Sequence, residues 1–142
     1  MGCGGSDGTG HPDYPFIVLK EGVDDKDLKS NTKNAESKLF QETKDKTHTK
    51  KFLKVAGKKG KDVEIAKEDF TKILEELTRT YTTNKAYETT FEVNDEFVDG
   101  LWEKYGEGEE SIKEDKVHEY LTELFKHEVK IGKAEQKARK EE

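Results

Sequence analysis

The chain has 142 residues and a formal net charge of −6, with 30% hydrophobic and 41% charged residues. Average globular domains are nearer half apolar and a quarter charged, so the sequence predicts one domain with a small core and polar tails. Lysine supplies most of the positive charge, and so few arginines in an acidic chain argue against a nucleic-acid-binding protein. No apolar run approaches the roughly 18 residues of a membrane-spanning helix, and a single cysteine excludes an internal disulfide.

The first residues, MGCGGSDGTG, carry a pattern typical of N-terminal acylation. Gly2 stands where removal of Met1 leaves an unhindered amine for a myristoyl group, and Ser6 occupies the slot that requires Ser or Thr. Cys3 lies beside it, where a palmitoyl group would supply the second signal that stable anchoring needs. We therefore expect a lipid-anchored protein at the cytoplasmic face of a membrane. The alternative is a glycine-rich tail that happens to begin Met-Gly.

Residues 1–33 are expected to form a flexible arm and linker, because they are mostly small or polar and include two prolines. Within them, Phe16-Ile17-Val18-Leu19 is an isolated apolar run. We predict that this run occupies or edges an apolar groove of the domain and so competes with a partner; the alternative is the ordinary packing of an N-terminal arm.

The first predicted helix starts at Asn34, a suitable N-cap, and ends at Gly57. Few apolar residues occur around 43–49, so a break is expected there. After a basic loop, the second predicted helix occupies 65–81 and carries apolar side chains at helical spacing.

A polar linker leads to the third predicted helix, which begins after Asn94 and ends near Tyr105. The last predicted helix follows Ile112 and continues to about residue 131. Residues 132–142 are expected to form a charged tail, so the predicted domain spans 34–131.

One sequence pattern occurs twice, as IAKEDFTKILEEL at 65–77 and as IKEDKVHEYLTEL at 112–124. A constant shift pairs Ile65 with Ile112 and pairs the apolar positions that follow. Each copy has a loop and a helical stretch before it. The duplication therefore predicts an all-α domain of two helix–loop–helix units.

This arrangement resembles a pair of EF-hands, over roughly residues 34–126. In the second unit, Val98 and Leu101 fall on apolar positions of an entering EF helix, and Ile112 falls where the loops would pair as short strands. The resemblance implies a four-helix domain whose groove binds a helix of a partner protein. The residues expected to line that groove are Phe70, Leu74, Leu77, Phe97, Leu101, Tyr120, Leu124 and Phe125.

The loops depart from the ligand pattern that this resemblance implies. In the first, Lys58 and Gly60 occupy the first two ligand slots; in the second, Lys116 stands where a bidentate acid is needed. We therefore expect no cofactor and little or no Ca²⁺ binding. If an ion were bound, its ligands would come from Asp62, Asp69, Glu107, Glu109, Glu110 and Asp115.

The two loops also carry opposite charges. Attraction between them could neutralise crowded charge at the loop end of the domain, or they could be two unrelated solvated loops. The basic residues of the first loop are Lys58, Lys59 and Lys61, and the acidic residues of the second are Glu107, Glu109 and Glu110.

No catalytic constellation is found: the four histidines lack metal-ligand spacing, and no serine has a nucleophile setting. We expect a membrane-tethered EF-hand-like adaptor that binds a protein, and neither an enzyme nor a nucleic-acid binder. The alternative is a lipid-anchored Ca²⁺ sensor with non-standard EF loops.

Overall fold

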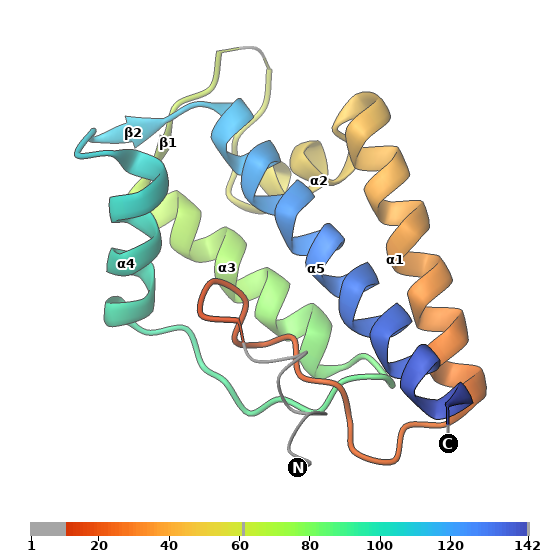
Figure 1. The fold of residues 1–142 in the computed structure, drawn as a ribbon. Helices are drawn as coiled ribbons and strands as arrows, with labels where there is room; N and C mark the ends of the chain where they lie inside the picture. Colours follow the sequence, from red (N-terminus) through yellow and green to blue (C-terminus); the bar gives the residue numbers. More distant parts are fainter. Residues whose placement is uncertain (1–10, 61, 142) are drawn as a thin grey trace.

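The computed structural model describes residues 11–60 and 62–141. Within these ranges it is mostly helical, with one two-stranded sheet, which confirms the expected all-α class (Figure 1). The helices are α1 (Asp25–Asp45), α2 (Thr47–Val55), α3 (Lys67–Thr82), α4 (Asp95–Gly106) and α5 (Glu114–Lys140). The strands are β1 (Ile65–Ala66) and β2 (Ser111–Ile112).

The two strands join the two repeats. They pair antiparallel, and their register sets Ile65 opposite Ile112 and Ala66 opposite Ser111. Both isoleucines are buried, so the pair links the two loops by backbone hydrogen bonds and also closes one end of the core. The expected pairing of these two positions is thus present in the fold.

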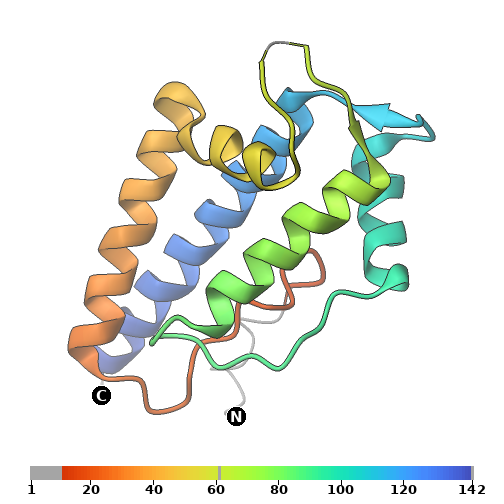
Figure 2. The same ribbon diagram turned by 180° about the vertical axis from the view of Figure 1, so that it is seen from behind.

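Helix α5 is central in the arrangement. It lies between α1 on one side and α3 and α4 on the other, and both views show α1 and α5 side by side and antiparallel (Figures 1 and 2). Its buried side chains recur at helical spacing, as expected for a helix that faces a core along much of its length. These residues are Val117, Tyr120, Leu121, Leu124, Phe125, Glu128, Ile131 and Gly132.

Helix α1 begins at Asp25, so the expected start at Asn34 is wrong and the expected domain boundary falls inside a helix. Asp25 and Asp27 lie in its first turn, where negative charge is favourable. Apolar periodicity did not predict this start of the helix, because the buried face of α1 includes the polar residues Asn31 and Thr32. The expected break near 43–49 is confirmed, since Lys46 adopts a left-handed backbone with φ 58° between α1 and α2.

The expected charged tail is also corrected, because α5 continues to Lys140. Ile131 and Gly132 are buried, and a Cβ at Gly132 would clash with the hydroxyl of Thr32. Only glycine allows this close approach of α5 to α1. The boundary expected at residue 132 therefore falls inside a packed helix.

The arm is packed against the domain over the part that the structure describes, which corrects the expectation of flexibility there. Phe16 and Ile17 are 0% exposed, and Tyr14 is also buried. Two backbone hydrogen bonds fix the arm to the α3–α4 connection: Lys20 N–H donates to the Ala86 carbonyl at 2.8 Å, and Glu88 N–H donates to Val18 at 2.9 Å. In the described ranges, no helix has the length and apolar character needed to cross a membrane.

Candidate functional site

The residues expected to line a groove do come together, but they do not form an open one. Seven of them are buried in a single core cluster, and only Phe97 is partly exposed at its margin. The lining therefore forms part of a closed core in the described structure. The seven are Phe70, Leu74, Leu77, Leu101, Tyr120, Leu124 and Phe125.

The arm helps to close this core. The ring of Tyr14 lies 5.3 Å from that of Tyr120, and the ring of Phe16 lies 5.4 Å from that of Tyr81. Tyr120 also donates from its hydroxyl to the Asp13 carbonyl at 2.8 Å. Phe16 and Ile17 of the apolar run thus belong to the same cluster as the predicted lining, together with Tyr14 just before them.

One ion pair holds the start of the described arm against α4. Lys104 Nζ lies 2.5 Å from an Asp13 carboxylate oxygen, and this contact raises the pKa of Lys104 above its usual value. Burial raises the pKa of the neighbouring Tyr14 hydroxyl, with the hydroxyl of Tyr105 and the Asp13 charge adding to the effect. Tyr14 therefore stays protonated at physiological pH.

A depression of about 420 Å³ remains open between the arm and α4. The rings of Phe91 and Phe97 lie 5.0 Å apart in an edge-to-face arrangement beside it. This is the part of the predicted lining that solvent reaches, at the Phe97 edge. The depression is lined by Pro12, Asp13, Pro15, Phe91, Asn94, Glu96, Phe97, Gly100 and Leu101.

A buried carboxylate on α5, which sequence reasoning missed, ties three helices together. Glu128 is 0% exposed and accepts hydrogen bonds from Tyr81 of α3 at 2.5 Å and from Lys38 of α1 at 3.1 Å. Asn31 adds a third donor at 3.3 Å. Burial first, and then the Glu128 charge, raise the pKa of Tyr81 well above its usual value, so Tyr81 remains a donor. The helical spacing that places Glu128 on the apolar face of α5 is the sequence signal for this network.

A second buried carboxylate, Glu42 at the end of α1, caps the next helix. It accepts from the backbone N–H groups of His48 at 2.7 Å and Thr49 at 3.0 Å, and also from the Thr49 hydroxyl. On its other side, His118 Nδ1 of α5 lies 2.6 Å from Glu42 Oε2. Because the first N–H groups of a helix lack partners within the helix, this carboxylate fixes α2 against α1 and α5.

In the first loop, the expected last ligand position is engaged by the protein itself. The Asp69 carboxylate accepts from Ala66 N–H at 3.0 Å and so caps the start of α3. Lys58 Nζ lies 3.2 Å from the same oxygen. An ammonium therefore neutralises Asp69 from the slot where the EF-hand pattern needs an oxygen ligand. Asp62 is exposed and adopts φ 54°.

The second loop is built around an indole. Trp102 donates from Nε1 to the Glu109 carbonyl at 3.2 Å, and Glu109 N–H donates to the Gly106 carbonyl at 2.8 Å. The acidic side chains expected as alternative ligands point to solvent. Among the described residues, no three side chains of His, Cys, Asp or Glu gather closely enough to hold a metal ion. The exposed acids are Glu107, Glu109, Glu110 and Asp115.

The loops do contact each other, with a charge pattern opposite to the one expected. Glu64 of the first loop accepts from the Ser111 hydroxyl at 3.3 Å and lies 3.8 Å from Lys113 Nζ, which follows β2. Lys58 pairs with Asp69 of its own unit instead of with the acidic second loop. The remaining sequence-based site residues, Lys61 and the acylation residues Gly2 and Cys3, lie outside the described residues.

Comparisons with known proteins give no match, because no family model, no curated protein and no solved structure matches this chain.

Proposed function

We propose that this chain is a lipid-anchored, EF-hand-like adaptor that binds a helix of a partner protein where its own arm now packs, and that it has no catalytic role. The observation that carries the proposal is the shared burial of Phe16, Ile17 and the predicted lining residue Tyr120 in one apolar cluster. The partner would displace the arm and take over its contacts.

The pairing of Ile65 with Ile112 supports the EF-hand-like part of the proposal. In a pair of EF-hands, two loops meet through a short antiparallel pair, and each loop is followed by a helix that packs on a shared core. Here β1 leads directly into α3, and β2 leads into α5. The match lies in the order and pairing of the elements.

The way the arm is attached supports exchange with a partner. Its backbone is held by few hydrogen bonds to the 86–88 segment, while its affinity for the domain comes from a small number of apolar side chains. Full burial of one such side chain contributes roughly 1.5–3 kcal/mol. A partner helix with several apolar anchors could compete with a segment held this way.

A competition experiment tests the arm. Ile17→Asp should release the arm, raise partner capture from membranes and increase binding of a hydrophobic dye, whereas Val18→Asp, at a half-buried position, should do so less. Because a buried charge can unfold the domain, a synthetic peptide of residues 11–20 is the second test. This peptide should compete with the captured partner. Native stability, no added dye signal and unchanged capture for Ile17→Asp would contradict the proposal.

Acylation is tested separately. Gly2→Ala should move the protein to the cytosol, because it removes the acyl acceptor and leaves Cys3 without membrane contact. Cys3→Ser should leave transient attachment, since one myristoyl chain binds only marginally. Retention of the Gly2→Ala variant at the membrane would overturn this part of the proposal.

The proposal includes little or no response to Ca²⁺. The Lys58–Asp69 pair supports this, because an ammonium competes with a dication for the Asp69 carboxylate. Helicity and Trp102 fluorescence should stay nearly constant in a Ca²⁺ titration. A saturable response at micromolar Ca²⁺ would favour the sensor alternative instead.

A further inference from the structure

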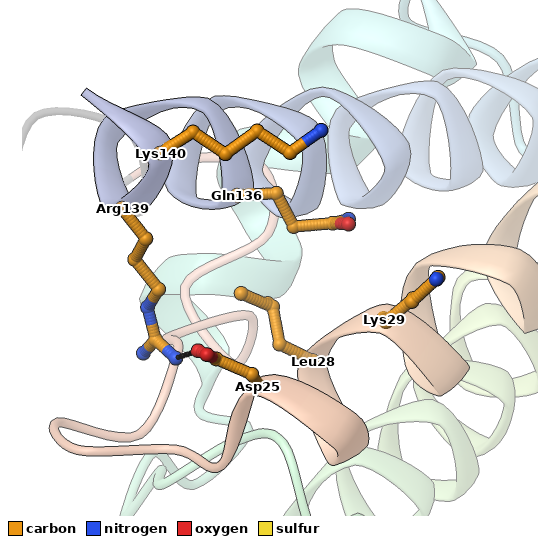
Figure 3. A pocket seen from close by; sticks show the side chains of 6 residues that line it. All are labelled: Asp25, Leu28, Lys29, Gln136, Arg139 and Lys140. Atoms are coloured by element: carbon orange, nitrogen blue, oxygen red, sulfur yellow. Dashed lines mark hydrogen bonds and ion pairs between the residues drawn. The ribbon is translucent and has the colours of Figure 1, made fainter.

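Away from the candidate site, the first half of α1 and the last turns of α5 form a basic surface. Figure 1 shows the start of α1 beside the end of α5. A shallow depression between the two helices is lined mostly by exposed lysines. Figure 3 shows the adjoining pocket, with Lys29 of α1 facing Lys140 of α5 across it. The depression is lined by Lys29, Thr32, Lys33, Glu36, Lys133, Gln136, Lys137 and Lys140.

Some cations here have partners. Lys133 lies 3.0 Å from Glu36, and Arg139 contacts Asp25 at 2.5 Å and Glu135 at 2.9 Å (Figure 3 shows the Asp25 contact).

Four lysines are left with no ion pair to any residue in 11–60 or 62–141, and all four are exposed. They are Lys29, Lys33, Lys137 and Lys140, and we name them the α1/α5 lysine face. On a chain with a net charge of −6, this face is a local excess of positive charge.

The packing of α1 on α5 creates this face. Gly132 lets α5 approach Thr32 of α1 so closely that a Cβ would collide with its hydroxyl. The lysines of the two helices therefore line one depression instead of two separate surfaces. Neither row of lysines would form this face alone.

The chemistry of the face suits a diffuse negative surface. Lysine is a hydrated point charge on a flexible stem, whereas a defined phosphate or carboxylate is usually recognised by the rigid fork of arginine. The one arginine nearby, Arg139, is occupied by two carboxylates. Clustered lysines of this kind fit the headgroups of anionic lipids.

We infer that the α1/α5 lysine face contacts the anionic headgroups of a membrane. The inference builds on the proposed lipid anchoring, because one acyl chain binds marginally and a basic patch can act as a second signal. The contact itself is electrostatic and needs no acyl chain, so the unacylated full-length protein is sufficient to test it.

The experiment measures sedimentation of unacylated protein with vesicles of phosphatidylcholine, with and without phosphatidylserine, at low salt. Binding should require phosphatidylserine and should weaken as salt is added. Each lysine near such a surface strengthens binding by about fivefold, so a variant with all four lysines of the face changed to Gln should bind roughly six hundredfold more weakly. All four side chains are exposed, and circular dichroism should confirm that the variant is folded.

The matched control removes the same charge elsewhere, from Lys50, Lys54, Lys59 and Lys72. These are exposed and likewise have no ion pair to the rest of the described chain, and three of them line another depression near the first loop. The control variant should keep most of the binding. Equal losses in the two variants would mean that binding follows total charge, and the inference would be wrong.

Two further outcomes would also overturn it. One is equal binding to neutral and anionic vesicles. The other is displacement by inorganic phosphate but not by chloride at matched ionic strength, which would indicate a discrete phosphate site instead of a membrane contact. Absence of vesicle binding would leave partner capture by the arm site unaffected, so this inference and the proposed function can fail separately.

Discussion

The two helix–loop–helix units share the β1–β2 pair but start their first helices differently. In the second unit, α4 carries its own cap, because the Asn94 side chain accepts from Phe97 N–H at 2.9 Å. In the first unit, the shorter α2 has no side-chain cap of its own at Lys46 and relies on Glu42 of α1. The first unit therefore depends on a helix outside the repeat, whereas the second starts from local sequence.

The loops differ in the same way. The first contains an internal ion pair between Lys58 and Asp69, while the second folds its backbone around Trp102. The duplicated residues thus specify where the helices pack and where the loops pair. They do not specify the contacts that stabilise each loop, and these are made by different side chains in the two units.

The largest effect is expected at the element that the units share. Ile65→Ala and Ile112→Ala should each lower the free energy of unfolding by about 2–5 kcal/mol, because both remove buried side chains from the core. Urea unfolding measures both, and Val63→Ala, at a half-buried neighbour, is the control with a smaller expected loss. If only one of the two substitutions lowered the free energy of unfolding, the strand pair would not be an element on which both units depend.

The second prediction compares the caps. Glu42→Ala should cost about 2–3 kcal/mol, because it removes the carboxylate that accepts hydrogen bonds from two backbone N–H groups and takes away the partner of His118. Asn94→Ala should cost about 1 kcal/mol, as a single local cap does, and Asn94→Ser should restore stability. Thermal unfolding followed by circular dichroism gives both values. If Glu42→Ala and Asn94→Ala lowered the stability equally, the cap from α1 would be worth no more to α2 than the local cap is to α4.

Sequence patterns predicted the parts of the fold that local chemistry determines. Periodic apolar residues located the two units, the repeat aligned Ile65 with Ile112, and Asn94 was identified as a cap that the structure confirms. The helix and cap signals each lie within a few turns of the chain, and the repeat compares two such short stretches.

The remaining features depend on contacts between distant segments. Asn31 and Glu128 are polar side chains on buried faces, and they fit only because they meet each other and Tyr81 across helices. Gly132 gives no local sign of a helix, yet it is where α5 packs on α1. The candidate site was predicted as a set of residues with the run at Phe16 covering or edging it, but no pattern in the sequence specifies that Phe16 lies against Tyr81.

The third prediction concerns the loop ion pair. Lys58→Ala should lower stability by about 0.5–1 kcal/mol, since it leaves the largely buried Asp69 carboxylate without a cation, and Lys58→Arg should retain most of that stability. In the other unit, Lys116→Ala should have no measurable effect, because its contact with Glu119 is exposed and 4.0 Å long. Urea unfolding midpoints provide the comparison. Equal losses of stability for Lys58→Ala and Lys116→Ala would show that the Lys58–Asp69 pair does not stabilise the first loop.

The smallest effect is a pH dependence confined to the first unit. Burial lowers the pKa of His48 below its usual value near 6.5, with Lys38 and Lys51 acting in the same direction and the Glu42 charge opposing them. The folded protein then binds a proton at His48 less readily than the unfolded chain does, so this contribution to stability is present above pH 6.5 and is lost as the pH falls below it.

Unfolding midpoints measured across that range should therefore drop more on acidification for the native sequence than for His48→Gln. Identical pH profiles for the native chain and His48→Gln would mean that the half-buried imidazole is free to take up a proton in the folded state. In that case the Glu42 charge would be strong enough to offset burial, and the α2 cap would be insensitive to pH.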